Sequence, residues 1–129
     1  MIVPNAVSIL IADVDAEQGI IDGHVELFSH LAACLSDAAI IIAASDYVRA
    51  YPHMIAAYLE ARFTALGADG FGRSDTRQAL RAFFEVDRRS VVIAALASLA
   101  TEGLIAREVV SNAIERYGVN SSAPPPWTI

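Results

Sequence analysis

Seven consecutive apolar residues, 38–44 (AAIIIAA), constrain this chain more than any other feature of its sequence. The run is too short to be a helix that is apolar on every side, but it fits a strand that is buried on both faces. Such strands lie at the centre of parallel sheets that helices cover on both sides. The run therefore predicts a parallel sheet in an α/β protein.

Segments on both sides of this run alternate between strand and helix patterns. Residues 6–12 (AVSILIA) and 62–66 (RFTAL) are candidate strands. Between the first strand and the central run, apolar residues recur at steps of four and three from Ile21 to Leu35, which predicts an amphipathic helix. Alternation of this kind predicts a three-layer α/β/α arrangement with a short, mostly parallel sheet.

A second helix pattern follows the central run. Ser45 and Asp46 offer side-chain oxygens that can cap its N-terminus. Pro52 falls inside the segment, where it should kink the helix or restart it. The apolar stripe of this helix is formed by Val48, Tyr51, Ile55, Tyr58 and Leu59.

Helices dominate the C-terminal half of the sequence. One helix is expected over residues 86–100 with Gly103 as its stop, and another over residues 106–117 with Gly118 as its stop. The residues of the last helix expected to face inward are Val109, Val110, Ala113, Ile114 and Tyr117. The proline-rich tail, residues 119–129, should be extended, with Trp127 docked on the domain or on a partner.

Composition limits the classes of partner. The 129 residues predict one domain. Only 19% of them are charged and 55% are hydrophobic, which favours a second copy or a larger chain as a partner, with a homodimer as the simplest case. A net charge of −6 argues against nucleic acid and anionic membranes as partners. The single cysteine, Cys34, and the absence of a long apolar stretch indicate a cytoplasmic protein without a membrane span.

The glycine-rich segment GADGFGRSD, residues 67–75, holds the most concentrated candidate site. Its candidate residues are Gly67, Asp69, Gly70, Phe71, Gly72, Arg73, Ser74 and Asp75. Asp75 and Gln78 have capping-box spacing, so a helix should begin there. A strand, a glycine loop and a helix N-terminus can hold a phosphate, although the spacing fits neither the dinucleotide fingerprint nor a P-loop. A structural or interface loop is the alternative, fixed by pairs between Asp69 or Asp75 and Arg73 or Arg77.

Other titratable residues form no recognisable site in the sequence. His24, His30 and His53 are scattered, without carboxylates or cysteines at metal-ligand spacing. Cys34 lies in an apolar helix pattern and is interpreted as a small buried residue. We therefore expect no catalytic residue and no metal ligand in this chain.

Several longer motifs resemble one known family. The segments GADGFGRSDTR (67–77) and FFEVD (83–87), with IIAASDYVRAYP (41–52) before them and VVIAALASLATEG (91–103) after them, resemble the C-terminal domain of the homodimeric pyruvate dehydrogenase component. The resemblance covers roughly residues 28–129. It divides the chain into an unmatched strand and connection (1–27), a domain similar to the transketolase C-terminal domain (28–118) and the proline-rich tail (119–129).

The resemblance implies a fold and a role. In that family the full enzyme decarboxylates pyruvate and transfers the acetyl group to lipoyl groups, and two upstream domains bind thiamine diphosphate and magnesium. The third domain supports the dimer near the active-site mouth, which would place the 67–75 loop at an interface or at that mouth. Ala68-Asp69-Gly70 departs from the family's GDG thiamine motif, and no matching asparagine follows. No cofactor is therefore expected in this chain, and its fold would be a version of the family domain shortened at the N-terminus.

Three hypotheses follow. The chain is an accessory or interaction domain, not catalytic alone, which self-associates or binds other pyruvate dehydrogenase domains. Alternatively, it is a small domain that binds a phosphorylated metabolite through residues 67–74. A third hypothesis makes it one part of a split enzyme.

Overall fold

The structure, a computed structural model, describes residues 7–12, 35 and 38–128. Its strands are β1 (Val7–Ala12), β2 (Ile40–Ser45) and β3 (Arg62–Leu66), and its helices are α2 (Ala50–Ala56), α3 (Arg77–Phe83), α4 (Arg88–Thr101), α5 (Arg107–Tyr117) and the 3₁₀ turn η1 (Pro126–Thr128). The helix expected between residues 21 and 35 falls almost wholly outside the described residues. Among the described residues, no helix is both long enough and apolar enough to cross a membrane.

The three strands form one parallel sheet in the order β1-β2-β3. Val7 pairs with Ile40, and Ile40 pairs in turn with Arg62. β2 is central because its apolar run is buried, with Ile41 and Ile42 fully inaccessible to solvent. All three predicted strands and their parallel arrangement are confirmed.

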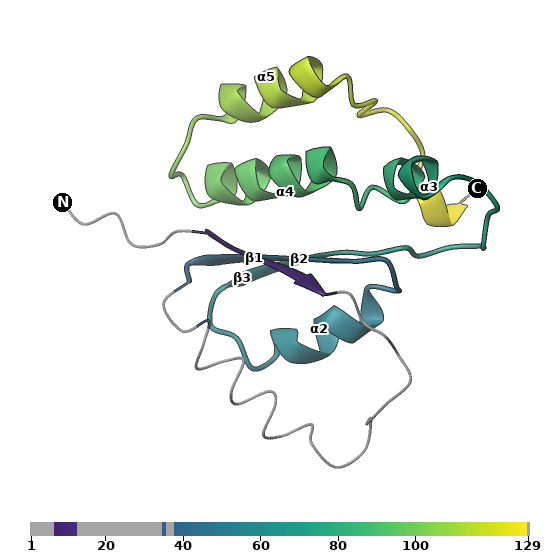
Figure 1. Cartoon of the computed structure of the whole chain (residues 1–129). Coiled ribbons are helices and arrows are strands. Elements are labelled where there is room, and N and C mark those ends of the chain that lie inside the picture. The colour runs from purple at the N-terminus through teal and green to yellow at the C-terminus, as the bar shows by residue number, and fades with distance from the viewer. Residues whose placement is uncertain (1–6, 13–34, 36–37, 129) are drawn as a thin grey trace, which may run out of the picture.

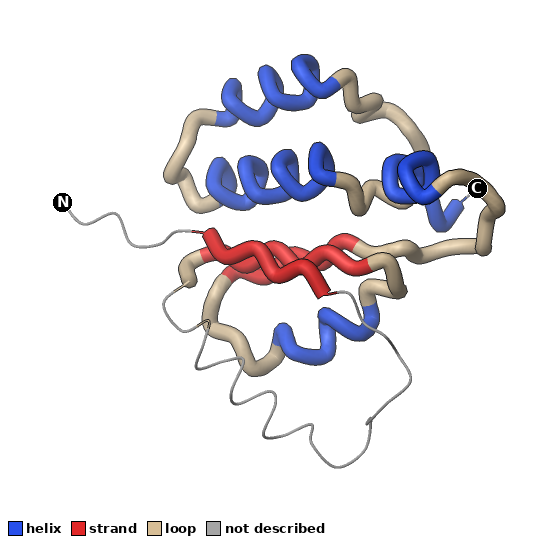
Figure 2. The backbone as a smooth tube through the Cα atoms, viewed as in Figure 1, coloured by secondary structure: helices blue, strands red, loops and turns tan. Residues whose placement is uncertain are grey.

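Helices cover both faces of the sheet (Figures 1 and 2). α2 lies on one face, and α3 and α4 lie on the other. On the α4 side, Ile40, Ile42 and Ala44 pack with Val91 and with partly buried residues of α4. Side chains alternate along a strand, so Ile41 and Ala43 point to the α2 side. The described elements therefore form an α/β arrangement with β2 in the middle of its core.

The last helix lies in a layer that its sequence pattern does not specify. α5 packs on the outer side of α4 rather than on the sheet (Figure 1). None of its five expected inward residues is buried: Val109 and Tyr117 are exposed, at 43% and 36%, and Val110, Ala113 and Ile114 are partly buried. Its stop is as predicted, since Gly118 has a φ of 63° in the left-handed region.

The prediction for the start of the second helix is wrong. α2 begins at Ala50, without a side-chain cap, and Ser45 is the last residue of β2. The Ser45 hydroxyl oxygen instead accepts a hydrogen bond from the Tyr47 amide at 3.1 Å. Pro52 is the third residue of α2, where an amide would have no partner within the helix, so it neither kinks nor restarts the helix.

The apolar stripe expected along this segment is only partly buried. Ile55 is 8% exposed, whereas Tyr51 and Tyr58 are 48% and 58% exposed. The predicted stripe is therefore wrong as a helical face, because α2 ends at Ala56 and begins at Ala50, which leaves Val48, Tyr58 and Leu59 outside the helix.

Side-chain caps define the starts of the next two helices. α3 is capped by Thr76, whose hydroxyl oxygen accepts from the Ala79 amide at 3.3 Å, and not by the expected Asp75–Gln78 box. Asp75 lies just before this cap, and its carboxylate accepts a hydrogen bond from the Thr76 amide at 2.7 Å. α4 is capped by Asp87, and Gly103 follows its end with a φ of 73°.

Candidate functional site

The glycine-rich loop connects β3 to α3 at the carboxyl end of the sheet, as the sequence predicts. Gly67 is buried there against the segment that leaves β2. A Cβ at this position would lie 2.6 Å from the Tyr47 carbonyl oxygen and 2.8 Å from the Arg49 amide nitrogen. Both neighbours are backbone atoms, so only glycine fits without a shift of the chain.

Asp69 fixes the loop to the start of α2. Its carboxylate pairs with the Arg49 guanidinium, and its other oxygen accepts from the Arg49 amide at 2.9 Å. Partial burial opposes the charged form of Asp69, but these hydrogen bonds outweigh it and lower the pKa of the carboxyl below its usual value. The expected pairing of Asp69 with Arg73 or Arg77 is therefore wrong, because its partner comes from the start of α2.

The C-terminal tail packs against the arginine of the same ion pair. The Arg49 guanidinium carbon lies 4.3 Å from the centre of the Trp127 ring, which is within the range of a cation–π contact. Gly70, with a φ of 122°, has its α-carbon facing the backbone of Pro126 and Trp127, where a Cβ would lie 3.2 Å from each. We call Arg49, Asp69, Gly70 and Trp127 the clasp. The predicted docking of Trp127 is confirmed, but the tail ends in a 3₁₀ turn rather than a fully extended segment.

The outer half of the loop faces solvent. Phe71 is 82% exposed, and a Cβ added to Gly72 would meet nothing within 4 Å. Arg73 stacks over the ring of Phe83 at 4.1 Å instead of pairing with a carboxylate. The partly buried half of the loop thus carries the negative charge of Asp69. This charge would repel a phosphate bound at the same place.

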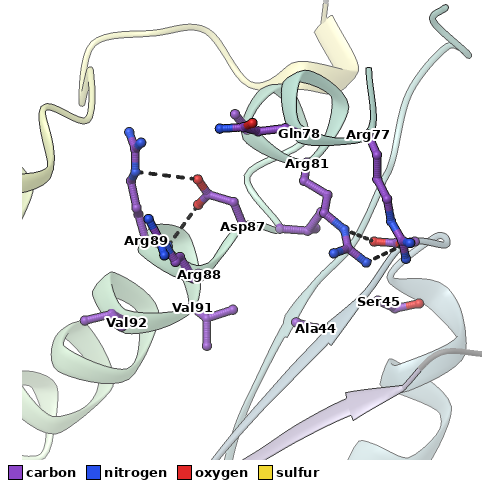
Figure 3. A pocket seen from close by; sticks show the side chains of 13 residues that line it. Ala44, Ser45, Arg77, Gln78, Arg81, Asp87, Arg88, Arg89, Val91 and Val92 are labelled. Atoms are coloured by element: carbon purple, nitrogen blue, oxygen red, sulfur yellow. Dashed lines mark hydrogen bonds and ion pairs between the residues drawn. The ribbon is translucent and has the colours of Figure 1, made fainter. Parts of the chain in front are cut away.

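A second group of charged residues follows β2 at the same edge of the sheet (Figure 3). Arg81 donates two hydrogen bonds to the Asp46 carboxylate, at 3.1 and 2.8 Å, and Arg77 approaches the same carboxylate at 3.5 Å. The hydrogen bond from Arg81 is the main cause of a lowered pKa of Asp46, with burial acting in the opposite direction. The two arginines come from successive turns of α3.

These residues form one wall of an open cleft of about 840 Å³. The opposite wall is the first turn of α4, with Asp87, Arg88 and Arg89, and the floor is apolar, with Ala44 and Val91 among its residues. We call this site the arginine-rimmed cleft. Ligands of parallel α/β sheets commonly bind outside the carboxyl ends of the strands, which is where this cleft lies.

Sequence reasoning did not find the arginine-rimmed cleft. Two signals were present: an acidic residue directly after the central strand, and arginines at positions 77 and 81, one helical turn apart. What the sequence could not show is that Asp46 and Arg81, thirty-five residues apart, meet across the end of β2.

The other sequence candidates contribute little to either site. His53 lies on α2, with its ring 6.0 Å from that of Phe63. Within the part of the chain that the structure describes, no group of three or more His, Cys, Asp or Glu side chains could hold a metal ion. His24, His30 and Cys34 lie outside that part.

Fold and site together define a class: an α/β unit with a parallel sheet, whose charged groups gather at the carboxyl ends of its strands. No protein-family profile matches the chain. Individual proteins do match it.

The relatives share one name. The chain is 48% identical over 102 residues to the pyruvate dehydrogenase E1 component of Cupriavidus necator, covering 78% of this chain and 11% of that protein. It is 49% identical over 80 residues to the E1 component of Haemophilus influenzae, covering 61% of this chain and 9% of that protein. For the E1 component of Escherichia coli the identity is 39% over 98 residues, covering 75% of this chain and 11% of that protein.

The matched segment of this chain is thus homologous to a segment of pyruvate dehydrogenase E1 components, as its motifs indicated. The chain spans about one tenth of the length of these relatives.

Proposed function

We propose that this chain is an accessory, interaction-type part of a pyruvate dehydrogenase E1 assembly, corresponding to the transketolase-like C-terminal domain, and that it does not catalyse on its own. The observation that carries the proposal is the 48% identity over 102 residues to only 11% of an E1 component. In this view, pyruvate decarboxylation and acetyl transfer belong to the larger assembly, in the cytoplasm.

The state of two carboxylates at the carboxyl edge of the sheet, those of Asp46 and Asp69, supports a role without acid–base chemistry. An effective general acid or base has a pKa near the working pH. The pKa values of Asp46 and Asp69 are both lowered by arginine partners, so each carboxylate is a weak base at neutral pH. Ion pairs of this kind fit a role in holding loops and helix ends in place.

The donor set around Asp69 does not fit thiamine diphosphate and its magnesium ion. A carboxylate that ligates magnesium needs an oxygen free to face the ion. Both oxygens of Asp69 accept hydrogen bonds from Arg49. We therefore propose that the chain binds no thiamine diphosphate by itself and that the cofactor belongs to other parts of the assembly.

Self-association is the second part of the proposal, with a homodimer as the expected species and other E1 domains as the alternative partners. Support comes from the large apolar side chains that the described surface exposes: Tyr47, Tyr51, Met54, Tyr58, Phe71, Val92, Leu104, Val109, Tyr117 and Trp127. Among them, the half-exposed rings of Tyr47 and Tyr51 lie 5.2 Å apart, and neighbouring exposed apolar side chains of this kind can mark a protein interface.

Three measurements on the purified chain test these proposals. Pyruvate turnover with added thiamine diphosphate and magnesium should be absent, and calorimetry should detect no stoichiometric cofactor binding; either signal would overturn the accessory role. Sedimentation at micromolar concentration should show a dimer. A strictly monomeric chain that also fails to bind the E1 component of Cupriavidus necator would remove the interaction role.

A further inference from the structure

The arginine-rimmed cleft carries more positive charge than its own carboxylates neutralise. Arg77, Arg81, Arg88 and Arg89 line it, against the two carboxylates of Asp46 and Asp87. The chain as a whole has a net charge of −6. The cleft is therefore a positively charged region on a negatively charged chain. Such a region concentrates anions from solution.

On the α3 wall, the positive charge of Arg77 is only weakly neutralised. Asp46 is engaged by Arg81 through two hydrogen bonds, at 3.1 and 2.8 Å. Arg77 reaches the same carboxylate at only 3.5 Å, and its side chain is 71% exposed. A carboxylate shared in this way leaves most of the charge of Arg77 available to a ligand.

On the α4 wall, Asp87 is committed to capping its helix. One of its oxygens accepts from the amides of Arg89 and Ser90 and from the Ser90 hydroxyl, at 2.9 to 3.0 Å. The Arg89 guanidinium lies 3.9 Å from the other oxygen. Arg88 forms no ion pair with any carboxylate among residues 38–128. This wall therefore offers Arg88 to an incoming anion.

The floor between the two walls is apolar. Ala44, Val86, Val91 and Val92 line it, and the volume of about 840 Å³ suits a small molecule. An inorganic ion alone would leave this floor unused, whereas an organic anion would cover it.

From these observations we infer a binding site, distinct from the glycine-rich loop, for a small organic anion. Its charged groups, carboxylate or phosphate, are held by Arg77 and Arg88, and its carbon skeleton lies over the valine floor. Arginine suits both groups, because its planar guanidinium forms paired hydrogen bonds with either. The inference concerns this cleft alone and does not depend on the proposed role in an E1 assembly.

Titration of the isotopically labelled chain in low-salt buffer tests the site, with succinate as the carboxylate probe and glycerol 3-phosphate as the phosphate probe. Saturable amide shifts are expected at Ser45, Arg77, Arg88 and Val91, with a midpoint in the millimolar range or below. The probe with the lower midpoint identifies the preferred anionic group. Sodium chloride at matched ionic strength should produce no saturable shift at these amides.

Variants distinguish the cleft from general charge attraction. Arg77→Gln with Arg88→Gln should raise the midpoint about tenfold or more, since each lost charged hydrogen bond is worth about a tenfold change. Arg107→Gln with Arg116→Gln, which removes the same two charges from α5 outside the cleft, should leave it unchanged. Unchanged far-ultraviolet circular dichroism would show that the variants are folded. No saturable shift with either probe, or equal weakening by the control variant, would overturn the assignment.

Discussion

The clasp and the arginine-rimmed cleft use the same chemistry at the same edge of the sheet, yet one is closed and the other is open. In the clasp, the Trp127 ring packs on the Arg49 guanidinium that pairs with Asp69, and next to the clasp Gly67 passes against backbone with no room for a Cβ. In the cleft, Asp46 and Arg81 stand beside open volume, with side chains 47% and 39% exposed. An aspartate–arginine pair thus either holds two segments together or lines an open cleft, according to what packs around it. Four changes test this comparison.

The largest effect on the free energy of unfolding is expected at Gly67, next to the clasp. Gly67→Ala places a Cβ within 2.8 Å of two backbone atoms, so the loop or the β2–α2 connection must move. We expect a loss of about 2–3 kcal/mol in the free energy of unfolding, measured by urea denaturation. Gly72→Ala is the matched control, since its Cβ meets nothing within 4 Å and stability should change by less than about 0.5 kcal/mol. Equal effects at both glycines would contradict the closed clasp.

Removing the negative charge of Asp69 should have the next largest effect on the free energy of unfolding. Asp69→Asn breaks the pairing with the Arg49 guanidinium and should cost about 1–2 kcal/mol at pH 7. The pKa of Asp69 is lowered on folding, so its contribution is present above the usual value of 3.8 and is lost as the pH falls through the folded value. The stability difference between the wild type and Asp69→Asn should therefore be constant from neutral to mildly acidic pH and shrink below 3.8. A stability difference that grows on acidification would show that the pKa of Asp69 is not lowered on folding.

The aromatic cover of the clasp should contribute less. Trp127→Ala removes the cation–π contact with Arg49, which is worth about 0.5–1 kcal/mol at a partly exposed site. Trp127 is the single tryptophan of the chain, so its fluorescence reports on the clasp directly. Asp69→Asn should shift that emission, whereas Asp46→Asn should leave it unchanged. An emission spectrum that is identical in the wild type and both aspartate variants would mean that the ring does not sense the ion pair.

The smallest effect is expected in the cleft. Asp46→Asn removes a carboxylate that is 47% exposed, and exposed ion pairs contribute less than about 1 kcal/mol. Added salt should reduce this contribution further, because solvent ions screen charges at an open site. Urea denaturation at low and high salt measures both expectations. A loss larger than that of Asp69→Asn would reverse the proposed contrast between the two sites.

Local patterns predicted the parts of this fold that depend on neighbours in sequence. The uniform run of β2 identified the centre of the sheet, and the β3 boundaries agree with the structure at both ends. Gly118 stops α5 in the left-handed conformation that a glycine favours. Such features are set by a few adjacent residues, so their signal lies in the sequence itself.

Sequence patterns did not predict the features that depend on residues far apart in the chain. The Ser45 hydroxyl suits a helix cap by residue type, but it is used in the turn that follows β2. Asp69 could be assigned to a nearby arginine by spacing, whereas its true partner, Arg49, lies at the start of α2. The sequence pattern of α5 predicted which of its residues face inward, but it did not predict that α5 packs on α4. Each of these outcomes depends on which elements meet in space, and amphipathic patterns do not specify that.

The position of α5 on α4 has a consequence for the order of folding. The two helices are joined by a short turn, so their mutual packing requires little loop closure. Each parallel strand pair, by contrast, must bring together segments separated by an entire connection. We therefore expect the α4–α5 hairpin to form early and the three strands to assemble on it later, with the ordering of the sheet as the slow step.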